Sequence, residues 1–219
     1  MPSVKMPKKS TDTDMTPFVD VAFLILSFFM LATKFKPPEP VPVTMPNSVS
    51  AEKLKESDNV MITVDKDSKV YFTVSSPKDP VVFKTIIESL NSARSLGLTP
   101  AEMSKFNGTT MVGVPFASLK QFLNLSLEQQ NKTIQPGIPV LDSATNELVW
   151  WVSAAKQGFA NKRLVYLVKG DNTSKYPTFD GVISALKRNE EFKYNLITSP
   201  EDVPNGSALD LFNQQPAKK

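Results

Sequence analysis

One acidic side chain, Asp20, lies near the start of an otherwise apolar segment that runs from Met15 to Phe35. An ionised carboxylate in the middle of a membrane helix costs about 2.5–3.5 kcal/mol on insertion scales. Two chemical roles fit such a group. It is either simply hydrated at the headgroup boundary, or it takes up and releases a proton beside a protein partner or a water path.

The polar residues of this segment share one side of a predicted helix. At about 100° per residue, Thr16, Asp20 and Ser27 fall within roughly 40° of each other. The other side chains between residues 16 and 32 are apolar. A polar stripe favours burial against protein rather than lipid. Serine and threonine in membrane helices also bond their own backbone, so the stripe alone leaves both roles of Asp20 open.

The length of the apolar segment is that of a membrane span. About 19 residues from Met15 to Thr33 carry a single charge, and at about 1.5 Å each they cover roughly 28 Å as a helix. The end of the segment lacks the small-residue pattern of a signal-peptide cleavage site. We therefore predict an uncleaved transmembrane helix over residues 15–36.

The basic residues around this helix give a slight preference for one orientation. Lys5, Lys8 and Lys9 precede the apolar segment, and Lys34 and Lys36 follow it. The positive-inside rule then favours a cytoplasmic N-terminus. A short leader before a large C-terminal domain favours the same topology, with that domain on the other side of the membrane.

Composition excludes several classes of chemistry. The 219 residues include no Cys and no His, which removes thiol nucleophiles, imidazole bases, disulfides and Cys/His zinc sites. A net charge of +3 is too mild to indicate nucleic-acid binding. We find no nucleophile elbow, phosphate loop or carboxylate pair. We therefore expect no enzymatic activity, no metal and no cofactor.

Hydrophobic periodicity predicts an α+β domain. Its order is strand, strand, helix, insert, strand, helix, strand, which gives a small mixed sheet with helices on one face, ββαβαβ-like with a helical insert. The predicted elements are a hairpin of residues 60–64 and 70–74, a helix over 83–90, a strand within 162–171, a helix over 179–186 and a strand over 194–198.

The insert over about residues 98–161 is predicted to be helical at 115–130 and 146–160, with a loop at 133–143 between them. It contains the pair Trp150 and Trp151. Such a pair either rests on a membrane interface or partner, or straddles the edge of a core. We favour the core.

Five prolines between Pro37 and Pro46 indicate a stiff, extended linker. Val41, Val43 and Met45 alternate within it, so the segment is either a plain spacer or an edge strand, and an edge strand can bind a partner by extending a sheet. The predicted organisation is a leader at 1–14, a transmembrane helix at 15–36, a linker at 37–58, the α+β domain at 59–201 and a flexible tail at 202–219.

The stretch "DMTPFVDVAFLILSFFMLATKF" resembles the opening of the ExbD/TolR family, and in particular the ExbD-type proteins of Bacteroidetes. The matching residues are Thr16, Pro17, Phe18 and Asp20. The resemblance implies that Asp20 takes up and releases protons within a ring of ExbB/TolQ-like helices, and that two copies of this chain form a dimer there. It also implies that the residues just beyond the membrane pair with a periplasmic partner or the sister subunit.

The later stretch "LVYLVKGDNTSKYPTFDGVISALKRNEEFKYNLITSPED" is similar to the second half of the same family. Lys169, Gly170, Asp171 and Tyr176 match its pattern. We interpret these four residues as mainly structural, because an aspartate in a Gly-Asp turn usually orders that turn.

Two functions remain as hypotheses. In the first, the chain is a subunit of a proton-motive-force-coupled motor, with Asp20 as the proton-binding group and a TonB-like periplasmic protein as the driven partner. A TolR-like role in envelope maintenance is the alternative form of this first hypothesis. In the second, the chain is an adaptor or binding module tethered to the membrane, without any proton role.

Overall fold

A computed structural model describes residues 15–32, 41–48, 58–76, 79–160 and 162–200. The chain divides into two compact units, residues 1–39 and 40–219. The leader at 1–14 and the tail at 202–219, for which we made predictions, lie outside the described residues.

The first unit contains helix α1 (Thr16–Ala32). Pro17 is its second residue, a position whose N–H needs no partner within the helix. The prediction extended the helix over 15–36, but residues 33–36 lie outside the described part of the chain. Within the part of the chain that the structure describes, no helix combines the length and the hydropathy that a membrane crossing requires.

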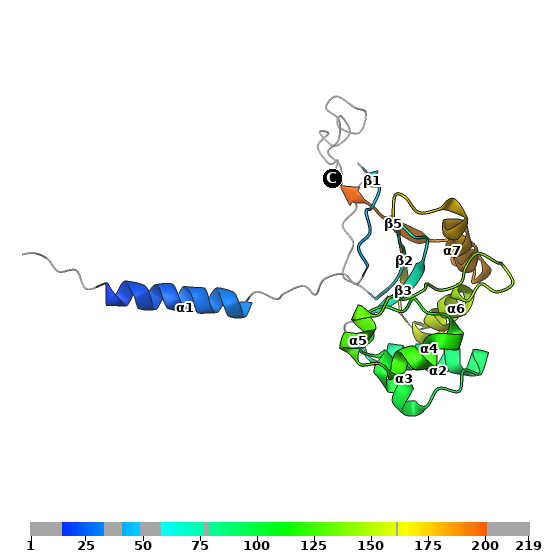
Figure 1. Cartoon of the computed structure of the whole chain (residues 1–219), viewed down its shortest axis with the longest axis horizontal. Helices are drawn as coiled ribbons and strands as arrows, with labels where there is room; N and C mark the ends of the chain where they lie inside the picture. The colour runs from blue at the N-terminus through cyan, green and yellow to red at the C-terminus, as the bar shows by residue number, and fades with distance from the viewer. Residues whose placement is uncertain (1–14, 33–40, 49–57, 77–78, 161, 201–219) are drawn as a thin grey trace, which may run out of the picture. The chain divides into compact units, whose positions relative to one another are not determined.

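The second unit contains a four-stranded mixed sheet, which confirms the predicted α+β class and the hairpin (Figure 1). The spatial order of its strands is β3-β2-β4-β5. Strands β2 and β3 are antiparallel, whereas β4 runs parallel to both β2 and β5. The bounds of the four strands are β2 (Asn59–Val64), β3 (Val70–Ser75), β4 (Val165–Gly170) and β5 (Tyr194–Ile197).

One face of this sheet contributes to the hydrophobic core. Val60, Ile62 and Val64 of β2 are fully buried there, next to Phe72 of β3 and Val168 of β4. Residues at alternate positions of a strand point to the same face. The buried residues of the helices belong to the same core as these strand residues, so the helices pack on this face, as the sequence predicted. The two helices expected beside the strands are α2 (Val81–Arg94) and α7 (Tyr176–Arg188).

The insert is helical, but it is built differently from the prediction. The single helix expected over 115–130 is two helices, because Ser126 caps a new helix through its side chain and the amide N–H of Gln129. A further short helix precedes them. The helices of the insert are α3 (Pro100–Phe106), α4 (Phe116–Asn124), α5 (Leu127–Lys132) and α6 (Leu148–Gly158), and no helix or strand is found in the predicted loop at 133–143.

The insert also closes one edge of the sheet. The backbones of Phe72 in β3 and Val112 in the insert exchange two hydrogen bonds, of 2.7 and 2.9 Å. The amide of Ile138 donates a third to the carbonyl of Val70 at 2.8 Å. The outer edge of β3 is therefore occupied by the chain itself, which removes a template for pairing with other chains.

The two tryptophans straddle the edge of the core, which confirms the alternative that we favoured from the sequence. Trp151 is fully buried, and its ring centroid lies 5.1 Å from that of Phe72 and 5.9 Å from that of Phe106. Trp150 is 39% exposed, and the guanidinium carbon of Arg94 lies 5.1 Å from its ring centroid. The insert therefore shares the core of the sheet.

A second, two-stranded sheet joins β1 (Asn47–Ser48) in parallel to β6 (Ser199–Pro200). Strand β1 belongs to the segment predicted as a linker, and β6 follows β5 directly. Residues 41–48 therefore belong to the folded unit, whereas the other linker residues, 37–40 and 49–57, lie outside the described part of the chain.

Candidate functional site

Asp20 lies in the second turn of α1, and it is the one titratable side chain between Thr16 and Ala32. Its side chain is exposed. The large apolar side chains along α1 are exposed as well, from 52% for Ile25 to 88% for Leu31. A helix that is apolar on nearly all sides needs lipid or protein around it, and Asp20 is its one group whose charge can change.

The predicted polar stripe follows from the helical conformation of α1. In a helix over Thr16–Ala32, the positions of Thr16, Asp20 and Ser27 fall on one side. Ser27 is half-buried, and its hydroxyl donates a hydrogen bond to the carbonyl of Leu24 at 2.9 Å. Ser27 thus satisfies its own donor within the helix, and its further role on the stripe stays a prediction.

The chemistry available to this face of α1 is a change in the charge of one carboxyl group. A neutral carboxyl group is compatible with an apolar neighbour, whereas the anion needs water or a polar partner. Protonation of Asp20 therefore changes which surroundings α1 prefers.

The segment expected to bind a partner is attached to the folded unit. Val41, Val43 and Met45 are half-buried, and the residues between them are exposed. The amide of Thr44 donates to Oδ2 of Asp171 at 2.8 Å, and the carbonyl of Thr44 accepts from the amide of Asn172 at 2.9 Å. A partner-binding role for the three alternating residues stays a prediction.

Asp171 organises the turn after β4, as we interpreted it, and it also holds residue 44. Its Oδ1 accepts from the hydroxyl of Thr173 at 2.6 Å and from the amide of the same residue at 2.9 Å. These bonds, the Thr173 hydroxyl first, and the bond from Thr44 hold the pKa of the Asp171 carboxyl below its usual value. The Asp-x-Thr pattern signals the turn, but nothing in the sequence signals a contact with a residue 127 positions away.

The three other residues of the matched turn lie close together along the chain but differ in their surroundings. Lys169 is buried at 6% exposure, and Tyr176 is 75% exposed at the start of α7. Gly170 ends β4 in open space, because a Cβ there would meet no atom within 4 Å.

A buried polar pair on the hairpin was not predicted. The hydroxyl of Tyr71 donates to Oδ2 of Asp65 at 3.0 Å, and the amide of Lys69 donates to Oδ1 of the same carboxylate at 2.8 Å. Burial and then the neighbouring carboxylate raise the pKa of the Tyr71 hydroxyl. The pair fixes the β2–β3 turn, which is a structural role.

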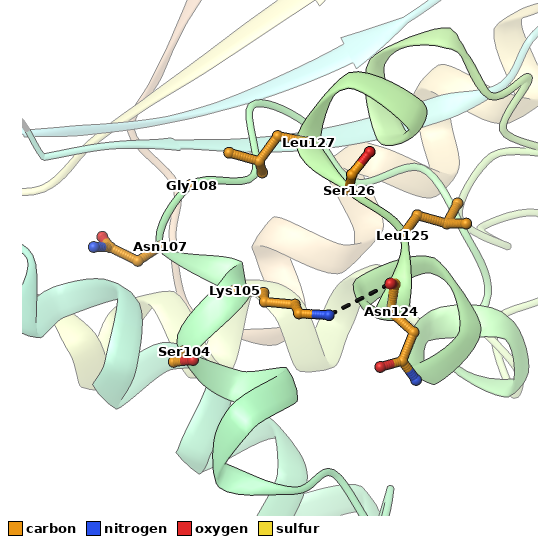
Figure 2. A pocket seen from close by; sticks show the side chains of 8 residues that line it. All are labelled: Ser104, Lys105, Asn107, Gly108, Asn124, Leu125, Ser126 and Leu127. Atoms are coloured by element: carbon orange, nitrogen blue, oxygen red, sulfur yellow. Dashed lines mark hydrogen bonds between the residues drawn. The ribbon is translucent and has the colours of Figure 1, made fainter.

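An open pocket of about 490 Å³ lies in the insert, between the end of α3 and the turn from α4 to α5. Figure 2 shows the side chains that line it. Lys105 Nζ donates to the carbonyl of Asn124 at 3.4 Å, and Asn124 Nδ2 donates to Glu102 at 2.8 Å. The described residues contain no cluster of three acidic side chains that could hold a metal ion. The cavity is lined by Ser104, Lys105, Asn107, Gly108, Asn124, Leu125, Ser126 and Leu127.

Comparison with known proteins bears on the chain as a whole. A search of the curated proteins finds no match, and neither does a search of the solved structures. A sequence model described as "Biopolymer transport protein ExbD/TolR" matches residues 6–201, a range that includes α1, the insert and every strand described above. The chain therefore belongs to the ExbD/TolR family of biopolymer transport proteins.

Proposed function

We propose that this chain is the proton-responsive subunit of an ExbB–ExbD-type motor, coupled to the proton motive force of a bacterial inner membrane. The observation that carries the proposal is the single carboxyl group of Asp20 on a helix whose other exposed side chains are almost all apolar. One charge that crosses the membrane field is worth about 2.3 kcal/mol per 100 mV. Protonation of Asp20 is thus the step through which α1 senses that field.

In this proposal α1 lies in the bilayer, with the leader in the cytoplasm and the folded unit in the periplasm. Support comes from the exposed apolar surface of α1, which lipid and neighbouring helices can cover. The three lysines of the leader favour the cytoplasmic side for the N-terminus.

The partners follow from the same considerations. An ionisable group in a membrane helix needs polar neighbours, because lipid cannot solvate it. We propose an ExbB/TolQ-like ring around α1, with a second copy of this chain inside the ring and a TonB-like protein as the driven component. Family membership supports partners of these types in general. We assign no enzymatic activity to the chain.

Replacement of Asp20 tests the proposal. Asp20→Asn keeps the shape of the side chain but cannot ionise, and Asp20→Glu keeps an ionisable group. We expect Asp20→Asn to copurify with the ring while proton flux into vesicles falls to the background of vesicles without the chain. Asp20→Glu is expected to retain part of the flux.

The control is Asp180→Asn, the same chemical change at an exposed position of α7. It is expected to leave flux unchanged. Full flux with Asp20→Asn in the assembled complex would establish the alternative, an adaptor held in the membrane by an inert helix.

The proposal also names the outer-membrane process that the motor would power. We propose nutrient import through TonB-linked outer-membrane transporters, because the stretch around Asp20 resembles the ExbD type. Cells that carry Asp20→Asn should then lose uptake of such nutrients and keep an intact envelope. Leakage of periplasmic proteins with normal uptake would instead identify the TolR-like role.

A further inference from the structure

Ser27 is the one polar side chain of α1 beyond Asp20, because the sequence from Val21 to Ala32 is otherwise apolar. Ser27 follows Asp20 by seven residues, which is about two helical turns and about 10.5 Å along the axis. Seven steps of about 100° return to within roughly 20° of the starting direction. A path that follows the Asp20 side of α1 away from the N-terminus therefore passes Ser27.

The hydroxyl group of Ser27 already uses its donor inside the helix. It donates to the carbonyl of Leu24 at 2.9 Å, so its proton is held by the backbone of α1. A serine hydroxyl has one donor and two acceptor positions, which leaves Ser27 with acceptor capacity for whatever lies beside the helix. A group that binds this oxygen must donate a hydrogen bond. A protonated water molecule is a stronger donor than a neutral one, because its hydrogen bonds are charge-assisted.

The residues around Ser27 leave room for such a donor. Among residues 15–31, which the structure describes, Ser27 is the one residue that is half-buried rather than exposed. The positions three and four residues away on the same side of the helix hold larger side chains: Phe23, Leu24, Met30 and Leu31. When other helices pack against these long side chains, the short one between them leaves a gap. A gap with a polar atom in its wall suits water, whereas an apolar one stays dry.

The separation of Ser27 and Asp20 suits a short chain of water molecules. About 10.5 Å corresponds to about four hydrogen bonds of about 2.8 Å between oxygen atoms, so roughly three water molecules connect the two side chains. In such a chain each water molecule accepts one proton and gives another to the next, and the Asp20 carboxylate accepts the last. Ser27 keeps its own proton throughout, so none of its covalent bonds forms or breaks.

We propose that Ser27 is a positioning residue for the proton step, and that its oxygen orders water between Asp20 and the periplasmic end of α1. This inference rests on the proposed function, in which Asp20 binds the proton and the N-terminus of α1 is cytoplasmic. In that topology Ser27 lies on the periplasmic side of Asp20, where protons enter under the proton motive force. Ser27 then directs their delivery along one side of the helix.

Two substitutions of equal shape separate the hydroxyl group from the size of the side chain. Ser27→Thr keeps a hydroxyl that can bond the backbone of the helix, and Ser27→Val has a methyl group in its place. Proton flux is measured in vesicles that contain the complex of the chain with its membrane ring, after copurification has shown assembly. We expect near-normal flux with Ser27→Thr and about fivefold lower flux with Ser27→Val, the size of effect that loss of one hydrogen bond gives.

The pH on the side where protons enter gives a readout that a merely structural role would not move. If Ser27 assists the delivery of protons, a higher proton concentration compensates for its loss. We expect the deficit of Ser27→Val to shrink as the pH on that side is lowered. Equal flux with Ser27→Thr and Ser27→Val, or a deficit of the same factor at every pH, would overturn the inference.

A hydroxyl moved to the other side of α1 provides the matched control. Ala22 lies about 200° from Asp20 around the helix, so Ala22→Ser adds a hydroxyl on the far side. The double variant of Ser27→Ala with Ala22→Ser has the same composition as the unaltered chain. We expect it to conduct as slowly as Ser27→Val. Full flux with the double variant would show that the side of the helix is irrelevant, which contradicts the inference.

A failure of this inference is distinct from a failure of the proposed function. Loss of flux in Asp20→Asn together with normal flux in Ser27→Val would leave the proton role of Asp20 standing and remove Ser27 from the path. Full flux in Asp20→Asn would instead remove the proposed function, and the role of Ser27 with it.

Discussion

Gly113 shows how a single residue sets the packing of the insert against the sheet. A Cβ at this position would overlap the ring of Tyr71, whose hydroxyl is bonded to Asp65. The amide of Gly113 donates to Oε1 of Gln135, which draws a second stretch of the insert to the same place. Close backbone approach to an aromatic ring is a recognised reason for glycine, and here it lets the insert cover Tyr71.

At this scale we predict that Gly113→Ala lowers the free energy of unfolding by about 1–3 kcal/mol, because the methyl group must displace a buried ring. Urea unfolding followed by tryptophan fluorescence measures the change. Gly170→Ala is the control, since a Cβ at Gly170 meets no atom within 4 Å. Equal midpoints for the two variants would show that Tyr71 can move aside freely.

At the scale of elements, the insert covers one edge of the sheet and part of its core. Its backbone pairs with β3 at Val112 and Ile138, and Trp151 of α6 packs on Phe72 of the same strand. Its first helix, α3, begins with a reciprocal cap, in which the Thr99 hydroxyl accepts from the Glu102 amide and the Glu102 carboxylate accepts from the Thr99 amide. The cap positions Phe106 at the end of α3 in the core.

We predict that Thr99→Ala lowers the free energy of unfolding by about 1 kcal/mol, because the Glu102 amide loses its acceptor and the reciprocal cap at the start of α3 is broken. Thr99→Ser keeps a hydroxyl and should retain most of the stability. Urea unfolding of the three proteins side by side gives the measurement. If Thr99→Ala and Thr99→Ser are equally stable, the reciprocal cap contributes nothing.

At the scale of the whole molecule, the hydrophobic core and Asp20 lie in different units of the chain. Every described core residue belongs to the unit of residues 40–219, and Asp20 belongs to the other unit. The core that stabilises the sheet and the carboxyl group to which we assign a proton role therefore belong to separate parts of the sequence.

We therefore predict that residues 40–219, produced without α1, unfold at the same thermal midpoint as the full chain, with free energies of unfolding that agree within about 0.5 kcal/mol, the usual effect of changes away from a core. Circular dichroism during heating measures both. The full-length Asp20→Asn variant should show the same midpoint. A shift of several degrees on removal of residues 1–39 would show that the first unit stabilises the second.

The order of strands and helices could be predicted because local periodicity encodes it. Alternation at Val60–Val64 and helical spacing at Phe83–Leu90 each bury one face, and burial of apolar area is the dominant favourable term in folding. The short helix α3 was missed, although Thr99 and Glu102 form the pattern that signals a helix start. Ser126 and Gln129 form the same kind of helix-start pattern at the break between α4 and α5. The apolar periodicity that continues across Ser126 obscured this pattern.

The sequence alone determined where the ionisable group lies. An apolar helix with a single carboxyl group, Asp20, follows from composition and spacing, and family membership agrees with it. Only the tertiary structure decided that Val112 closes the β3 edge and that Asp171 holds Thr44, because both contacts join residues far apart in the chain. Contacts of that kind depend on how packed elements bring backbone groups together, and no local pattern specifies them.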